Sequence, residues 1–103
     1  MWYGVSLLFK SCHQQPQGEE PLWEEIIIIV EAPSRDEAEA LARRNALTRE
    51  VGYEVAGNDF VTWVFDSVFD VCEVESEPLS SGTEVFSRFM RESEVRSLQS
   101  KFE

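Results

Sequence analysis

The side chains best suited to nucleophilic or metal chemistry are few in this sequence. Its one histidine, His13, directly follows Cys12, and the second cysteine, Cys72, lies far along the chain. A Cys–His nucleophile pair needs the imidazole presented to the thiol, whereas neighbours on an extended chain point to opposite sides. A structural zinc site needs about four ligands, and these three residues are too few without carboxylates. We therefore predict no catalytic residue, no metal site and no cofactor.

Carboxylates are abundant, and one pair stands out. Asp66 and Asp70 interrupt the same parity of a long apolar stretch, about 13 Å apart on a straight strand, and a bulge would change that distance. Such a pair suits general acid–base work or cation binding, while protection of a sheet edge and solubility explain it without chemistry. The sequence contains no glycine-rich phosphate loop, nucleophile elbow or HExxH motif. We therefore favour a non-enzymatic role over an enzymatic one.

Aromatic side chains fall mostly in stretches that predict strands, and most of them belong to the core. Several of these strands are apolar on both faces, however, and need two covering layers. One full helix and one short helix do not cover both faces of about five strands, and monomers rarely expose a large apolar patch. A homodimer, or a groove for an apolar ligand, resolves this mismatch. The candidate interaction or pocket residues are Trp23, Trp63, Phe65, Asp66, Asp70, Phe86 and Arg88.

The formal net charge of −11 limits the kinds of partner. Nucleic acids and anionic membrane surfaces are polyanions, so we predict neither as a partner. The acidic surface serves solubility, or it meets a basic protein. No apolar stretch reaches the ~18 residues of a membrane helix and no charged-then-apolar leader opens the sequence. We expect a cytoplasmic protein in which Cys12 and Cys72 are reduced and unbridged.

The sequence is organised around Trp23–Ala32, whose four isoleucines and one valine occupy both parities. β-Branched residues favour strands, and a two-sided apolar run predicts a central strand rather than an edge strand. Trp2–Lys10 alternates and predicts a half-buried strand that pairs with it in antiparallel orientation. The polar residues Ser11–Pro21 between them predict an exposed loop.

A helix follows this strand. Ser34 predicts its N-cap, and Glu37 stands three residues on, at the spacing of a capping box. At 100° per residue its inner face is rich in alanine, which lets a helix lie close against a sheet. That face includes Ala38, Ala42 and Ala46.

The second half of the chain predicts three more strands, of which the first is short and covers Tyr53-Glu54-Val55. Gly57-Asn58 is a hairpin signal, because both residues tolerate positive φ. Phe60–Glu75 is longer than a usual strand and predicts a bulge or bend near Asp66-Ser67. Thr83–Arg91 predicts a last strand, and apolar residues at helical intervals in 93–102 predict a short amphipathic helix.

These elements predict an α+β domain with a mainly antiparallel sheet of about five strands. Their order is strand, strand, helix, strand, strand, strand, with the main helix packed on one face of the sheet. We expect residues 1–103 to form a single domain, in which residues 92–103 form either a short helix or a flexible tail.

Segments in both halves of the chain carry a resemblance to a known family. They are WYGVSLLF, LWEEIIIIVEA, EAEALA, VTWVFDSVFDVCEV and GTEVFSRF, in this order. On these segments the chain resembles a small bacterial family, domain of unknown function 4288. The resemblance implies a bacterial, cytoplasmic, stand-alone domain, and it brings no activity, cofactor or catalytic residue to carry over.

Three functions follow from these patterns. The first is a non-enzymatic protein-interaction module that forms a homodimer through the surface or edge of its sheet. The second is an acidic immunity- or inhibitor-type protein that covers a basic partner, for which salt-sensitive binding would be evidence. The third is a small-ligand-binding protein or enzyme with a Trp/Phe-lined pocket near Asp66 and Asp70, for which a deep pocket with converging polar groups would be evidence.

Overall fold

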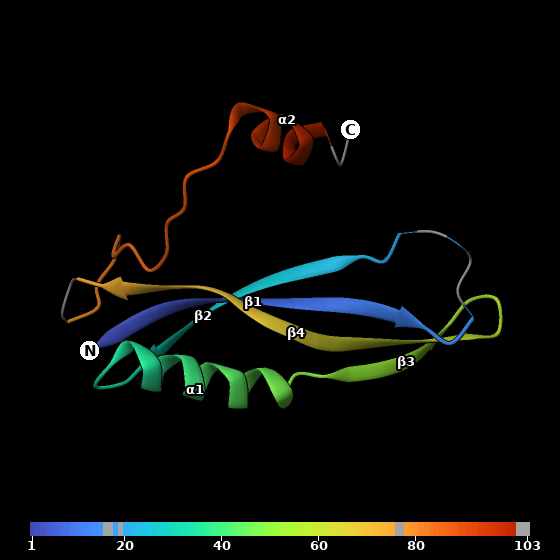
Figure 1. Cartoon of the computed structure of the whole chain (residues 1–103), viewed down its shortest axis with the longest axis horizontal. Coiled ribbons are helices and arrows are strands. Elements are labelled where there is room, and N and C mark those ends of the chain that lie inside the picture. The colour runs from blue at the N-terminus through green and yellow to red at the C-terminus, as the bar shows by residue number, and fades with distance from the viewer. Residues whose placement is uncertain (16–17, 19, 76–77, 101–103) are drawn as a thin grey trace.

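The fold is α+β, as predicted, with the strands in one antiparallel sheet (Figure 1). The computed structural model describes residues 1–15, 18, 20–75 and 78–100, and within them the sheet has four strands in the order β2-β1-β4-β3. Each neighbouring pair is antiparallel. The elements are β1 (Trp2–His13), β2 (Trp23–Glu31), α1 (Arg35–Leu47), β3 (Val51–Val55), β4 (Asp59–Val74) and α2 (Glu92–Ser100).

β1 lies inside the sheet and supplies the centre of the core. It runs past the predicted end at Lys10 to His13, because β4 continues to pair with it over these residues. The predicted loop Ser11–Pro21 therefore begins later than expected, and Ser11 is buried. The core side chains of β1 are those of its odd-numbered residues Tyr3, Val5, Leu7 and Phe9.

α1 begins where the sequence predicts it. Ser34 Oγ accepts a hydrogen bond from the backbone N–H of Glu37 at 3.2 Å, which satisfies one of the free N–H groups of the first turn. Alanine side chains are small, so the helix backbone approaches the strands closely. The three fully buried residues of α1 are Ala38, Ala42 and Ala46.

α1 covers one face of the sheet, which we call the helix face (Figure 1). We call the opposite face the open face. Because side chains alternate along a strand, the open face takes the even-numbered residues of β1 and the odd-numbered residues of β2. Ser6 and Ile27 are paired neighbours on it.

β4 carries two bulges where the sequence predicts one. One shift in its pairing with β1 leaves Asp66 as the extra residue, at the predicted place. The other leaves Phe69 as the extra residue, and its side chain is 57% exposed. The predicted turn between β3 and β4 is also present, with positive φ at Gly57 and Asn58.

The prediction of a central strand at Trp23–Ala32 is wrong. β2 forms here and pairs with β1 in antiparallel orientation as expected, but it lies at the edge of the sheet. Apolar residues at both odd and even positions indicate that both faces of a strand are apolar. They do not indicate whether the strand has a neighbour on one side or on both sides. The two-sided pattern therefore belongs to an edge strand whose second face is not covered by α1.

The prediction of a fifth strand at Thr83–Arg91 is also wrong. These residues, which we call the C-terminal arm, join no ladder with any described strand. The predicted C-terminal helix is present as α2, while residues 101–103 lie outside the described residues. In the part of the chain that the structure describes, neither helix is long and apolar enough to cross a membrane.

Candidate functional site

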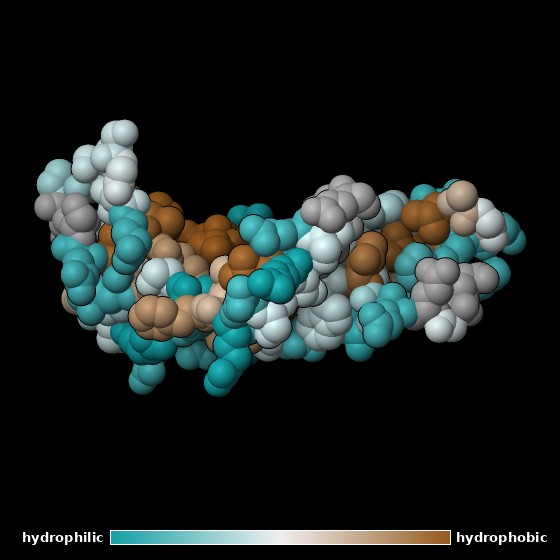
Figure 2. Space-filling model, turned by 90° about the horizontal axis from the view of Figure 1, so that it is seen from above, coloured by the Kyte–Doolittle hydropathy of each residue, from teal (hydrophilic) through white to brown (hydrophobic). Residues whose placement is uncertain are grey.

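The open face exposes apolar side chains along β2. Ile27 and Ile29 are 45% and 41% exposed, and Trp23 at the start of the strand is similarly exposed. Their alternate neighbours Ile26 and Ile28 pack against the core on the helix face. Figure 2, which looks down on this side of the molecule, shows hydrophobic areas separated by hydrophilic ones. The isoleucine run thus forms one covered row and one uncovered row.

The C-terminal arm crosses part of the open face. At Gly4 the backbone of Val85 passes so close that a Cβ on residue 4 would lie 1.5 Å from the Val85 carbonyl oxygen. Further along, the Cys72 thiol donates a hydrogen bond to the carbonyl oxygen of Ser87 at 3.6 Å. Glycine at position 4 therefore permits the arm to lie directly on β1.

An ion pair of Arg88 joins the arm to β2. Its guanidinium lies 3.2 Å from Glu25 Oε1, and Glu25 Oε2 accepts a hydrogen bond from the hydroxyl of Ser6 at 2.5 Å. Ser6 is fully buried, so its hydroxyl needs this partner. The chain of contacts from Ser6 through Glu25 to Arg88 joins β1, β2 and the arm.

Beyond Arg88 the arm leaves the sheet, and α2 stands clear of it (Figure 1). A hollow of about 860 Å³ lies between the arm, α2 and β4. Phe69 borders it from β4, at the unpredicted bulge. The other main residues around the hollow are Asp70, Arg88, Phe89, Met90 and Leu98.

The seven candidate residues lie in several places rather than in one. Asp70 and Arg88 border the hollow, and the other five do not. Trp63 and Phe65 pack against the core on the helix face. Trp23 lies at the start of β2, where the ammonium of Lys10 sits 5.4 Å from its ring centroid.

Phe86 and the two aspartates complete this set. Phe86 belongs to the arm and lies beside Gly4. Asp66 accepts a hydrogen bond from the hydroxyl of Ser67, while Asp70 lies 3.7 Å from the guanidinium of Arg35. The two carboxylates thus have separate partners.

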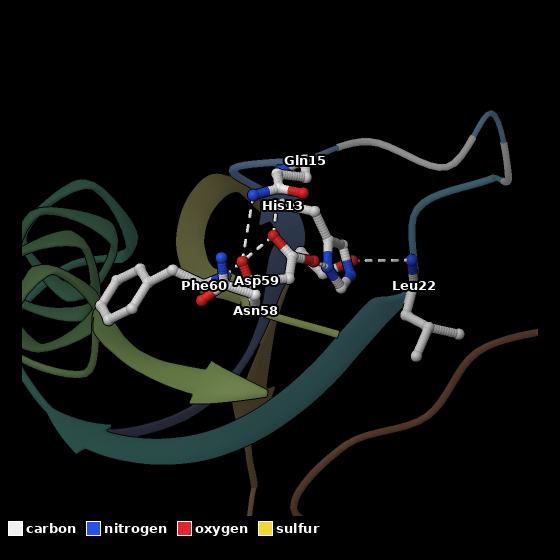
Figure 3. Close-up of polar contacts among 7 residues, drawn as sticks. His13, Gln15, Leu22, Asn58, Asp59 and Phe60 are labelled. Atoms are coloured by element: carbon white, nitrogen blue, oxygen red, sulfur yellow. Dashed lines mark hydrogen bonds and ion pairs between the residues drawn. The ribbon is translucent and has the colours of Figure 1, made fainter. Parts of the chain in front are cut away.

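A polar cluster at the end of β1 was not predicted (Figure 3). His13 Nδ1 lies 2.6 Å from Asp59 Oδ2, and Asp59 Oδ1 accepts hydrogen bonds from the backbone N–H groups of Gln15 and Phe60. These hydrogen bonds, that from His13 first, hold the pKa of the Asp59 carboxyl below its ordinary value. An ionised carboxylate only accepts, so Nδ1 of His13 carries the proton.

This cluster joins segments that lie far apart in the sequence. It has the imidazole and the carboxylate of a catalytic triad, but among the described residues no hydroxyl or thiol is hydrogen bonded to His13. Nor does the described part of the chain group three His, Cys, Asp or Glu side chains that could hold a metal ion. Cys12 and Cys72 are both unbridged, as predicted. The hydrogen bonds tie the end of β1 to the turn between β3 and β4.

Comparison with known proteins gives one match. A family model described as domain of unknown function (DUF4288) matches residues 2–87. This stretch holds the four strands, α1 and the beginning of the arm, while Arg88 and α2 lie beyond it. Neither the comparison with curated proteins nor the comparison with solved structures found a match.

Proposed function

Because the chain belongs to the family described as domain of unknown function (DUF4288), which assigns no activity, we propose a function from the surface that its strands expose. We propose that the protein is a non-enzymatic interaction module that works as a homodimer. The observation that carries this proposal is the exposed isoleucine row of β2, an edge strand.

β2 has the properties of a strand that pairs with another strand. It is nine residues long, and no described strand lies along its outer edge. Edge strands that stay unpaired are usually short, charged or covered, whereas long apolar edges invite pairing. A second β2 in antiparallel orientation would complete the ladder and continue the sheet across a twofold axis.

The charges at the ends of β2 favour one register for this pairing. Glu24 and Glu25 lie at one end and Glu31 at the other. With Ile27 opposite its own copy, each of these glutamates faces an apolar residue. If Ile27 instead faces Ile28 or Ile29 of the other copy, Glu31 lies opposite another glutamate. Like charges directly opposite each other destabilise a sheet. The charges therefore disfavour an axis nearer Glu31, and we place the twofold axis at Ile27, the middle residue of β2.

Ile27→Lys tests this proposal, with Leu47→Lys as its matched control. Both changes add the same charge at a largely exposed apolar residue, and Leu47 lies at the end of α1, away from β2. In sedimentation equilibrium at micromolar concentration, the wild type should have twice the 11.9 kDa mass of the monomer. Ile27→Lys should be monomeric, because the two lysine side chains would lie directly opposite each other at the twofold axis, and Leu47→Lys should stay dimeric. A wild type that is monomeric at every accessible concentration contradicts the proposal.

The hollow supports ligand binding as a second candidate function. Its volume of about 860 Å³ falls within the roughly 300–1,000 Å³ of small-molecule pockets, and Asp70 and Arg88 offer opposite charges beside Phe69. Phe69 and Phe89 leave much of their surface in solvent, however, whereas ligand pockets enclose their aromatic walls. The immunity- or inhibitor-type alternative draws support from the net charge of −11 alone.

A further inference from the structure

α2 stands apart from the other described helices and strands. No Cα atom of α2 lies within 8 Å of a Cα atom in any other described helix or strand. A helix of nine residues is marginal in water without tertiary packing. Its apolar residues Val95 and Leu98 lie three positions apart, on one side of the helix. α2 therefore lacks a packing surface from the other described helices and strands, which a second molecule could supply.

The end of the arm differs in charge from the rest of this acidic protein. Residues 88–91 read Arg-Phe-Met-Arg in a chain of net charge −11. Arg88 is paired with Glu25, whereas the guanidinium of Arg91 forms no ion pair with any described residue. Phe89 between them is fully exposed. Arginine is enriched at the hot spots of protein interfaces and phenylalanine in their buried cores, and an acidic surface complements the charge of Arg91.

The hollow beside Phe89 is not filled by the chain that forms it. Phe69, Phe89 and Leu98 all border it, yet each leaves half or more of its surface in solvent. The molecule thus presents a projecting aromatic side chain on the arm beside a partly apolar hollow between the arm, α2 and β4. Under a twofold axis each copy offers both features to the other, which is the condition for a closed, self-complementary interface.

We propose that the arm of a second copy closes this hollow, so that Phe89 of each copy packs against Phe69 and Leu98 of the other. The inference rests on the proposed homodimer and adds a second contact to it. Arg88 holds the arm at Glu25, near the start of β2, and thus beside the strand edge at which the two copies pair. A twofold axis perpendicular to the sheet puts both open faces on the same side, where the two arms meet.

The charges around the hollow and on the arm favour this exchange, in which the arm of each copy enters the hollow of the other. The rim of the hollow carries the carboxylates of Asp70 and Glu94 beside the guanidinium of Arg88, which is paired with Glu25. The entering arm carries Arg91 two positions after Phe89. The exchange therefore brings an unpaired arginine of one copy towards acidic groups of the other while it buries an aromatic ring. The acidic surface of a second copy is thus a better match for the arm than a neutral or basic partner.

Phe89→Ala tests the exchange, with Leu47→Ala as a control at another largely exposed apolar residue. Sedimentation equilibrium should show the dimer dissociation constant of Phe89→Ala raised about tenfold or more, and that of Leu47→Ala changed less than about twofold. If Phe89→Ala associates like the wild type, the exchange is wrong while the pairing of β2 stands. If the wild type itself is monomeric, the proposed homodimer fails as well.

A cross-linking experiment identifies the contact directly. Both natural cysteines are first removed by Cys12→Ser and Cys72→Ser in the full chain. One such chain then receives Phe69→Cys and another, of different mass, receives Phe89→Cys. The two chains are mixed and oxidised mildly. The exchange predicts a mixed disulfide dimer, and replacing the Phe69→Cys chain by a Leu47→Cys chain should abolish it. A chain with both Phe69→Cys and Phe89→Cys that forms its disulfide only within the monomer would show that the arm closes its own hollow, which overturns the proposal.

Discussion

Asp59 joins two turns that lie far apart in the sequence. Its carboxylate accepts hydrogen bonds from His13 at the end of β1 and from the backbone of Gln15 and Phe60, and these lower its pKa from the ordinary value of 3.8. A carboxyl whose pKa is lower in the folded state stabilises the fold above its unfolded pKa. That stabilisation is lost as the pH falls through the folded value. Asp59 therefore contributes its stabilisation above about pH 4 and loses it in stronger acid.

Asp59→Asn should lower the urea midpoint of unfolding at neutral pH. The amide carries no charge, and only its oxygen accepts hydrogen bonds, whereas both oxygens of the Asp59 carboxylate accept them. The difference from the wild type should shrink as the pH falls below 3.8. Equilibrium urea unfolding across this range measures it. Asp66→Asn is the control, since among the described residues the Asp66 carboxylate accepts a hydrogen bond from the adjacent Ser67 alone, and it should leave the midpoint nearly unchanged. A difference for Asp59→Asn that stays constant with pH would contradict the role of its charge.

β2 combines an interior face and an exposed face in one strand. Ile28 lies level with Val5 and packs against the core beneath α1, while Ile27 points to the open face. A change at Ile28 is therefore expected to act on folding, and under the proposed dimer a change at Ile27 is expected to act on association. The same residue type at adjacent positions provides an internal comparison.

Ile28→Ala should lower the free energy of unfolding by about 2 kcal/mol or more, since it removes apolar contacts and leaves a cavity in the core. Ile27→Ala, measured at a concentration where the protein is monomeric, should lower it by less than about 1 kcal/mol. Urea unfolding of both variants checks the difference. Equal losses at the two positions would mean that β2 does not present Ile28 to the core and Ile27 to solvent.

The whole molecule is more extended than a compact chain of its length. Its radius of gyration is 16.4 Å, whereas a compact domain of this size has about 13 Å. The projecting arm and α2 account for part of the difference, and the long twisted strands for the rest (Figure 1). The monomer thus leaves apolar surface in solvent on the side where α2 stands.

Small-angle X-ray scattering should therefore give a radius of gyration near 16 Å for the monomer, measured on Ile27→Lys or at high dilution. The value expected for a compact fold, about 13 Å, would mean that α2 folds back onto its own sheet. In that case the surface available to a second copy would be smaller, and the exchange of arms would lose its basis.

Local chemistry determined the parts of this fold that depend on neighbours in the chain. The N-cap at Ser34, the buried alanines of α1, the turn at Gly57-Asn58 and the bulge at Asp66 all follow from residue type and spacing. These features arise from φ/ψ preferences and hydrogen bonds within a few residues. The α+β class follows from them as well.

Only the tertiary structure decided which segments meet. Periodicity records which faces of a segment are apolar, so it predicted strand structure for the isoleucine run but not its place at the sheet edge. The same limit explains why Thr83–Arg91 matched a strand pattern and yet forms an arm over Gly4. The pairs His13–Asp59 and Glu25–Arg88, and the hollow beside Phe69, depend on residues dozens of positions apart. Their proximity is set by the order of strands in the sheet, which pairing and burial across the whole chain select.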